Sequence, residues 1–180
     1  MRAFRLVWGV LALFPGAVGA QTFFAGGGIG AVWERHAPVA PAKEWFHTTE
    51  AGESFFVAVA IDDETLLRVE RTDLPRDVMV RGTRWEARLA AWAVGVDYLL
   101  PGVFGQAVVA AGVGSYRLDL AARIPPPGVE DSRFGWYLRV GERFRLSRRF
   151  FLAAEVSYHR TSHPGSPQLL AAFGSLVASF

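Results

Sequence analysis

A run of polar side chains near the C-terminus has the residue types of a hydrolase site. The run is Tyr158-His159-Arg160-Thr161-Ser162-His163, and Glu155 precedes it. An imidazole can act as a general base toward a nearby hydroxyl, and a carboxylate can orient that imidazole. Glu155 and His159 would share one face of an extended strand, because side chains alternate between faces. A strand end followed by a polar external loop explains the same residues without catalysis, and we expect this second explanation to hold.

The other candidate sites are weaker still. His36 and His47 share a polar segment with Glu44 and Glu50, but their spacing matches no metal-ligand pattern. The glycine-rich run 26–30 lacks the lysine and the following helix of a phosphate-binding loop. The absence of Cys excludes a disulfide framework, a thiolate metal site and a cysteine nucleophile. We therefore predict no catalytic residue, no metal and no cofactor.

The basic charge of the chain is concentrated at its N-terminus. The 180 residues carry a formal net charge of +2, from 19 Lys and Arg against 17 Asp and Glu. Arg2 and Arg5 precede an apolar run (6–14) and a small-residue segment (18–20), which is the pattern of a secretory signal peptide cleaved after Ala20. Residues 1–20 contain both of these arginines and no acid, so the mature domain 21–180 is formally neutral. Nothing then favours a nucleic-acid partner.

Apolar residues of the mature domain recur with period two, which predicts strands. The apolar segments are about ten residues long, too short for a membrane-spanning helix but long enough for a tilted membrane-spanning strand. Strands cross a bilayer only in a closed barrel. With 51% hydrophobic residues in the chain, we predict an all-β fold, an eight-stranded antiparallel up-and-down transmembrane β-barrel. The expected strands are 23–34, 54–62, 65–72, 84–99, 104–118, 133–144, 150–160 and 168–180.

The expected connections alternate in length. The short ones are 63–64, 100–103 and 145–149, and the long polar ones are 35–53, 73–83, 119–132 and 161–167. Transmembrane barrels have short periplasmic turns and longer external loops, whereas a soluble sandwich has no reason to sort its loops in this way. We expect both termini in the periplasm and four loops outside, with segment 38–46 a candidate for docking a partner.

The alternation also predicts what fills the barrel. Eight strands leave an interior just wide enough for side chains, which argues against a wide diffusion pore. Charged residues enclosed there must pair, so we expect an internal ion-pair network. Its expected members are Arg68, Glu70, Glu86, Arg88, Arg139 and Glu155. Aromatic residues at strand ends are expected to form the two interfacial girdles.

Several segments are typical of one family. They are FFAGGGIGAVW (23–33), AIDDETLLRVE (60–70), VVAAGVGSY (108–116), GWYLRVGERFRLSRRFFLAAEVSY (135–158) and the terminal Phe180. Over residues 21–180 the chain resembles the small eight-stranded outer-membrane barrels of the OmpA transmembrane-domain, OmpX and opacity-protein type. The resemblance implies an outer-membrane location, contact with outer-membrane lipid and lipopolysaccharide, and recognition of Phe180 by the barrel-assembly machinery.

The resemblance also sharpens the question of catalysis. Some barrels that resemble this chain are lipid A deacylases with a His-x-Ser-Asn motif, and the corresponding run here is His159-Arg160-Thr161-Ser162. Thr161 stands where the nucleophilic serine belongs, and Ser162 replaces the asparagine. We predict a non-enzymatic role, in envelope structure or in surface interaction through the loops. A lipid A-modifying hydrolase using His159 and a soluble periplasmic barrel that binds an apolar ligand stay open as alternatives.

Overall fold

The computed structural model describes residues 22–35, 47–80, 83–120, 131–163 and 167–180, and the side chains of these residues apart from 47–50, 77–80 and 83–84. The predicted signal peptide, residues 1–20, lies outside the described residues. Within the described ranges, no helix has the length and apolarity needed to cross a membrane.

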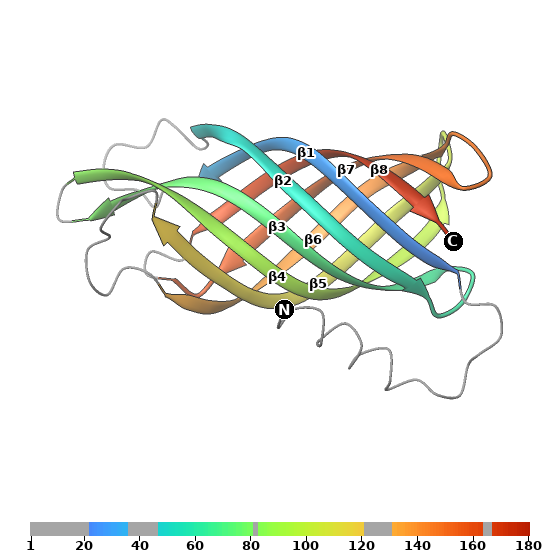
Figure 1. Ribbon diagram of the computed structural model, residues 1–180, viewed down its shortest axis with the longest axis horizontal. Helices are drawn as coiled ribbons and strands as arrows, with labels where there is room; N and C mark the ends of the chain where they lie inside the picture. The colour runs from blue at the N-terminus through green and yellow to red at the C-terminus, as the bar shows by residue number, and fades with distance from the viewer. Residues whose placement is uncertain (1–21, 36–46, 81–82, 121–130, 164–166) are drawn as a thin grey trace.

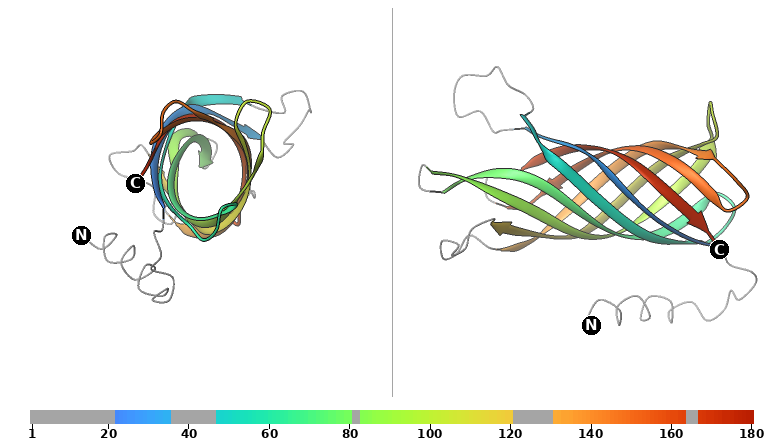
Figure 2. Two further views of the ribbon diagram at one scale, coloured as in Figure 1. Left: turned by 90° about the vertical axis from the view of Figure 1, so that its right-hand side faces the viewer. Right: turned by 45° about the horizontal axis from the view of Figure 1, so that its top comes forward.

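The described chain forms one closed antiparallel barrel of eight strands, as predicted (Figure 1). Each strand pairs with its neighbours in sequence, and the last strand pairs with the first. Seen end-on, the sheet makes a complete ring (Figure 2). The N–H of Phe180 donates to the carbonyl of Phe23 at 2.9 Å, at one end of the closing seam. The strands are β1 (Phe23–Arg35), β2 (His47–Ala60), β3 (Thr65–Val80), β4 (Thr83–Pro101), β5 (Gln106–Leu120), β6 (Ser132–Arg145), β7 (Phe150–Thr161) and β8 (Gln168–Ser179).

Side chains alternate between the lumen and the outer wall along most of each strand. On β6, the outward side chains of Phe134 and Leu138 are 61% and 53% exposed. The inward side chains of Tyr137 and Arg139 are 0% and 4% exposed. The large exposed residues of the other strands follow the same rule and are mostly Val, Leu, Ile and Phe. The apolar side chains therefore form an outer belt, while charged residues are enclosed, which is the reverse of a soluble protein.

The lumen is packed rather than open. One buried apolar cluster includes Leu74, Leu89 and Phe173, and a second includes Leu66 and Leu99. Along β3 the charged residues 68 and 70 lie between Leu66 and Leu74, so the register places buried charge between the two apolar clusters. The interior consequently alternates apolar and charged layers along its length.

One predicted loop is wrong and several strand ends move. Residues 73–80 continue β3, and β4 begins at Thr83, so 73–83 is a strand hairpin rather than a loop. The polar sequence of this segment does not predict a strand. Its inward side chains nevertheless pack inside the barrel, since Leu74 is fully buried and Arg76 pairs with Glu34 of β1 at 2.7 Å. A strand that extends beyond the lipid needs no apolar outer face. β2 likewise begins at His47 instead of 54, and β5 at Gln106 instead of 104.

Candidate functional site

Six buried charged side chains meet in the lumen and form the most polar cluster of the described interior. Four strands contribute them, and all are at most 4% exposed. The cluster contains three arginines and three carboxylates, so its formal charges balance. Its members, here called the lumen network, are Arg68, Glu70, Asp97, Arg139, Arg143 and Glu155.

Arg68 contacts all three carboxylates of the lumen network. Its Nε lies 2.8 Å from Glu70 Oε2, and its Nη1 lies 3.2 Å from Glu155 Oε1 and 3.6 Å from Asp97 Oδ2. The guanidinium also stacks over the Phe56 ring, 3.6 Å from the ring centroid. Stacking on an aromatic face suits a guanidinium, which is planar and weakly hydrated.

The two other arginines complete the lumen network from β6. Arg139 reaches Glu70 Oε2 and Asp97 Oδ1, both at 2.5 Å. Arg143 donates to the second oxygen of Asp97 at 3.0 Å. Each carboxylate therefore accepts from at least one guanidinium, which offsets the cost of removing these charges from water.

The structure confirms four predicted members of the network and corrects two. Glu86 and Arg88 are exposed on the outer wall, because they share the parity of Trp92 rather than that of the inward residues of β4. Asp97 and Arg143 were missed. The alternation of inward and outward residues indicates both. Asp97 has the same parity as the inward positions 89, 91, 93 and 95 of β4, and Arg143 has that of the inward positions 137, 139 and 141 of β6.

The candidate hydrolase run is divided between the two faces of β7. His159 is 1% exposed and lies inside the barrel, where its Nδ1 is 3.0 Å from the Tyr116 hydroxyl and its Nε2 is 2.9 Å from the Ser157 hydroxyl. Ser162 is exposed, and its hydroxyl donates to the carbonyl of Phe134 at 2.9 Å. Glu155 binds Arg68 instead of orienting the imidazole. Thr161, which stands in the position of the nucleophilic serine, has its hydroxyl 3.0 Å from His163 Nδ1. Glu155, His159 and these two hydroxyls therefore do not form a nucleophile, base and orienting acid.

The second histidine of that run links two segments at the external end. The Nδ1 of His163 is 3.0 Å from the Thr161 hydroxyl, and its Nε2 is 3.2 Å from the carbonyl oxygen of Asp131. Burial lowers the pKa of His163 below its usual 6.5. The neutral ring is therefore favoured at neutral pH. The other loop candidates lie outside the described residues or side chains, namely segment 38–46 and His36, Glu44, His47 and Glu50.

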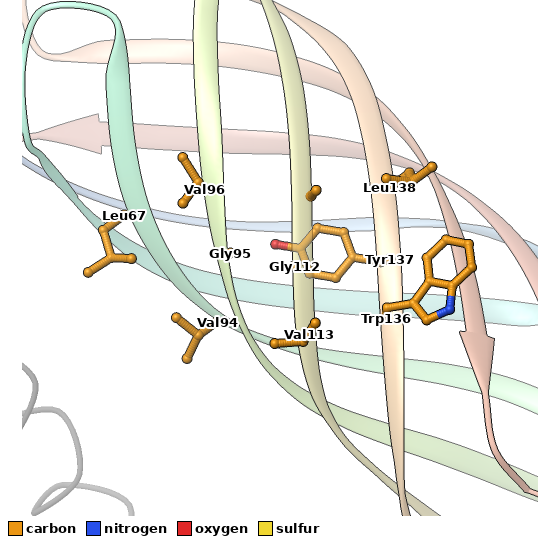
Figure 3. A pocket seen from close by; sticks show the side chains of 10 residues that line it. Leu67, Val94, Gly95, Val96, Gly112, Val113, Trp136, Tyr137 and Leu138 are labelled. Carbon is orange, nitrogen blue, oxygen red and sulfur yellow. The ribbon is translucent and has the colours of Figure 1, made fainter.

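A shallow apolar depression of about 410 Å³ marks the outer wall over β3 to β6 (Figure 3). Its floor is the register pair Gly95 and Gly112, and the Tyr137 ring lies behind both glycines on the lumen side. A side chain at either glycine would collide with that ring. The depression offers only lipid-like contacts, because its rim consists of Leu67, Val94, Val96, Ala111, Val113, Trp136 and Leu138.

Comparison with known proteins identifies the fold of the chain but not its family. No family model and no curated protein matches the sequence. Neisserial surface protein A matches with a TM-score of 0.66 and 9% identity, over 88% of this chain and 97% of that one. Ail of Yersinia pestis, in complex with the heparin analogue sucrose octasulfate, matches with a TM-score of 0.57 and 10% identity, over 89% and 99%.

A third similar structure is a major outer membrane protein from Thermus thermophilus. It matches with a TM-score of 0.59 and 12% identity, over 90% of this chain and 100% of that one. The chain therefore has the fold of the small outer-membrane β-barrels, as the sequence predicted.

Proposed function

We propose that the chain is an integral outer-membrane protein with a non-enzymatic role, in envelope structure or in surface contacts at its external end. The observation that carries this proposal is the distribution of side chains across the sheet. Each of the eight strands has exposed or half-buried apolar residues at outward positions, while the lumen network lies inside. This distribution is stable only where lipid covers the outer wall.

The packed lumen argues against two other roles. A soluble barrel that carries an apolar ligand needs an apolar cavity inside, but here the lumen network and two apolar clusters fill the interior. A diffusion pore needs a continuous aqueous path, which the same layers obstruct. Both arguments support a barrel that acts through its surfaces.

Lipopolysaccharide is the lipid partner that we propose for the external end. Arg88 on β4 and Arg117 on β5 are exposed on the outer wall, toward the external ends of their strands and beyond Trp92. Arg117 pairs with Asp119 at 2.7 Å, so the acid stands farther out than the arginine. Arginines near the external ends of the strands can donate hydrogen bonds to phosphate groups of the outer leaflet. At the opposite end Phe180 is exposed, which fits the proposed recognition by the barrel-assembly machinery.

Topology is the first experiment. A short epitope inserted in segment 121–130 is expected to bind antibody on intact cells, and the protein is expected to sediment with outer-membrane fractions. The same epitope inserted in the turn at 102–105 is the matched control and is expected to require permeabilised cells. Recovery of the protein in the soluble periplasm would overturn the proposal.

Catalysis is tested separately at His159. Because His159 is enclosed in the lumen, the His159→Ala variant is expected to leave the mass spectrum of lipid A unchanged. The comparison is made with cells that express the wild-type protein and with cells that lack it. A lipid A species that lacks an acyl chain and occurs only in cells with the wild-type protein would instead support hydrolase activity that depends on His159.

A further inference from the structure

The turn between β6 and β7 combines positive charge with exposed apolar side chains. It lies at the end of the barrel that holds the C-terminus (Figure 1), the end assigned to the periplasm. Arg145, Arg148 and Arg149 are all exposed, and among the described residues no carboxylate forms an ion pair with any of them. Leu146 and Phe150 on the same turn are also exposed. The turn therefore presents unneutralised cations beside apolar surface.

The backbone of this turn is held in place by hydrogen bonds. The hydroxyl of Ser147 accepts from the N–H groups of Arg149 and Phe150, at 3.3 and 3.2 Å. The N–H of Leu146 donates to the carbonyl of Phe150 at 2.9 Å, and the carbonyl of Arg149 accepts from Ser179 of β8 at 2.8 Å. The turn thus presents its arginines from a preorganised loop, which reduces the entropy cost of binding.

The apolar surface continues onto the neighbouring turn. Val103 and Phe104 between β4 and β5 are 85% and 75% exposed, and the Phe104 ring lies 6.2 Å from the ring of Phe144 on β6. The acid on this part of β6, Glu142, accepts from the N–H of Phe104 at 2.5 Å and so holds the neighbouring turn. Exposed aromatics beside arginines are typical of a bilayer interface, where rings enter the lipid and guanidiniums reach the headgroups.

Apart from Glu142, the acidic side chains described at this end lie on the opposite wall. The turn between β2 and β3 contains Asp62, Asp63 and Glu64, and it is four strands away from the basic turn in the closed ring. The N–H groups of Glu64 and Thr65 donate to Asp62 Oδ1 at 2.9 and 2.7 Å. These bonds lower the pKa of Asp62, so this acid stays charged near neutral pH. The positive charge of the basic turn is therefore local to one side.

We propose that the β6–β7 turn binds the phosphodiester headgroup of an anionic phospholipid in the leaflet that surrounds this end of the barrel. Arg148 and Arg149 would bind the phosphate oxygens, and Leu146 and Phe150 would contact the upper part of the acyl chains. The inference rests on the proposed function, because it requires that the barrel be inserted in a membrane. An anionic lipid is favoured over a zwitterionic one because the turn has no neutralising acid of its own.

The test measures lipid selectivity by native mass spectrometry. The protein is reconstituted in vesicles of equal phosphatidylglycerol and phosphatidylcholine, extracted gently, and scored for the two lipids that remain bound. The wild type is expected to retain phosphatidylglycerol preferentially. The double variant R148Q/R149Q is expected to lose about tenfold or more of that preference, since each arginine near an anionic surface contributes about fivefold.

The variant R71Q/R133Q is the matched control, because it removes the same charge from two exposed arginines that pair with Asp73 and Asp131, away from this turn. It is expected to keep most of the preference. Equal losses in the two double variants would show general charge attraction and overturn the inference, as would insertion of the wild type without any preference. Failure of the wild type to float with the vesicles would instead refute the proposed membrane role.

Discussion

Replacement of Arg68 by Met tests whether the lumen network stabilises the barrel. Methionine keeps an unbranched side chain that can fill the space, so the change removes charge with little cavity formation. Arg68 contacts Glu70, Glu155 and Asp97 at 2.8, 3.2 and 3.6 Å, and its side chain is 1% exposed. After its removal three carboxylates face two arginines.

The size of the effect follows from this enclosure. Removing one partner from a buried ion pair costs about 3–5 kcal/mol, because it leaves a buried charge uncompensated. Arg68→Met is expected to lie in that range. Adding Glu155→Gln restores a balance of two arginines and two carboxylates, so the double variant is expected to recover part of the loss. The free energy of unfolding is measured by denaturant titration in lipid vesicles, followed by tryptophan fluorescence.

Arg71→Met is the control on the same strand. Arg71 pairs with Asp73 at 3.0 Å, but its side chain is 47% exposed on the outer wall. An exposed pair contributes about 1 kcal/mol or less. If Arg68→Met and Arg71→Met unfold at the same denaturant concentration as the wild type, the lumen charges are solvated and the reasoning about their enclosure is wrong.

Two further changes probe packing and titration. Gly30→Ala is expected to destabilise the barrel by about 1–3 kcal/mol, because the new methyl would meet the carbonyl of Ala172 on β8. Gly174→Ala, with open space around its Cβ, is expected to change stability by less than about 0.5 kcal/mol in the same denaturant titration. His163 is expected to titrate below 6.5 in an NMR pH series, assigned with His163→Gln. Its lowered pKa contributes stability that is present above 6.5 and is lost as the pH falls through the folded value. A folded-state pKa at or above 6.5 would contradict its burial against Asp131.

The strands could be predicted because lipid and lumen impose opposite preferences on alternate residues. Where the outer wall faces lipid, as at Leu138 and Val140 on β6, the apolar alternation predicts the strand and its faces correctly. Beyond the lipid that contrast disappears. The polar sequence of residues 73–80 therefore predicts a loop, although Leu74 is buried and continues the inward parity of β3.

The lumen network could be predicted only in part, for a related reason. Arg68 and Arg139 stand between apolar neighbours, so their parity was clear. Glu86 and Arg88 lie near the external end of β4, where the outward residues are charged and the inward residues Ala87 and Leu89 are apolar, so charge does not mark the inward face there. Which carboxylate each guanidinium contacts depends on the register between strands distant in sequence, and alternation carries no information about that register.

The seam between β1 and β8 determines how the barrel can form. Phe24 pairs with Ser179 across this seam, whereas every other pairing among the described strands joins neighbours along the chain. The seam thus has the largest loop-closure entropy cost of any single pairing among the described strands, and contacts of that kind form late and slowly. Before closure β1 and β8 are open edges, whose unpaired N–H and C=O groups cannot be left in hydrocarbon. Closure and insertion are therefore expected to be one cooperative event, with the eight-stranded ring as the smallest unit that the bilayer tolerates.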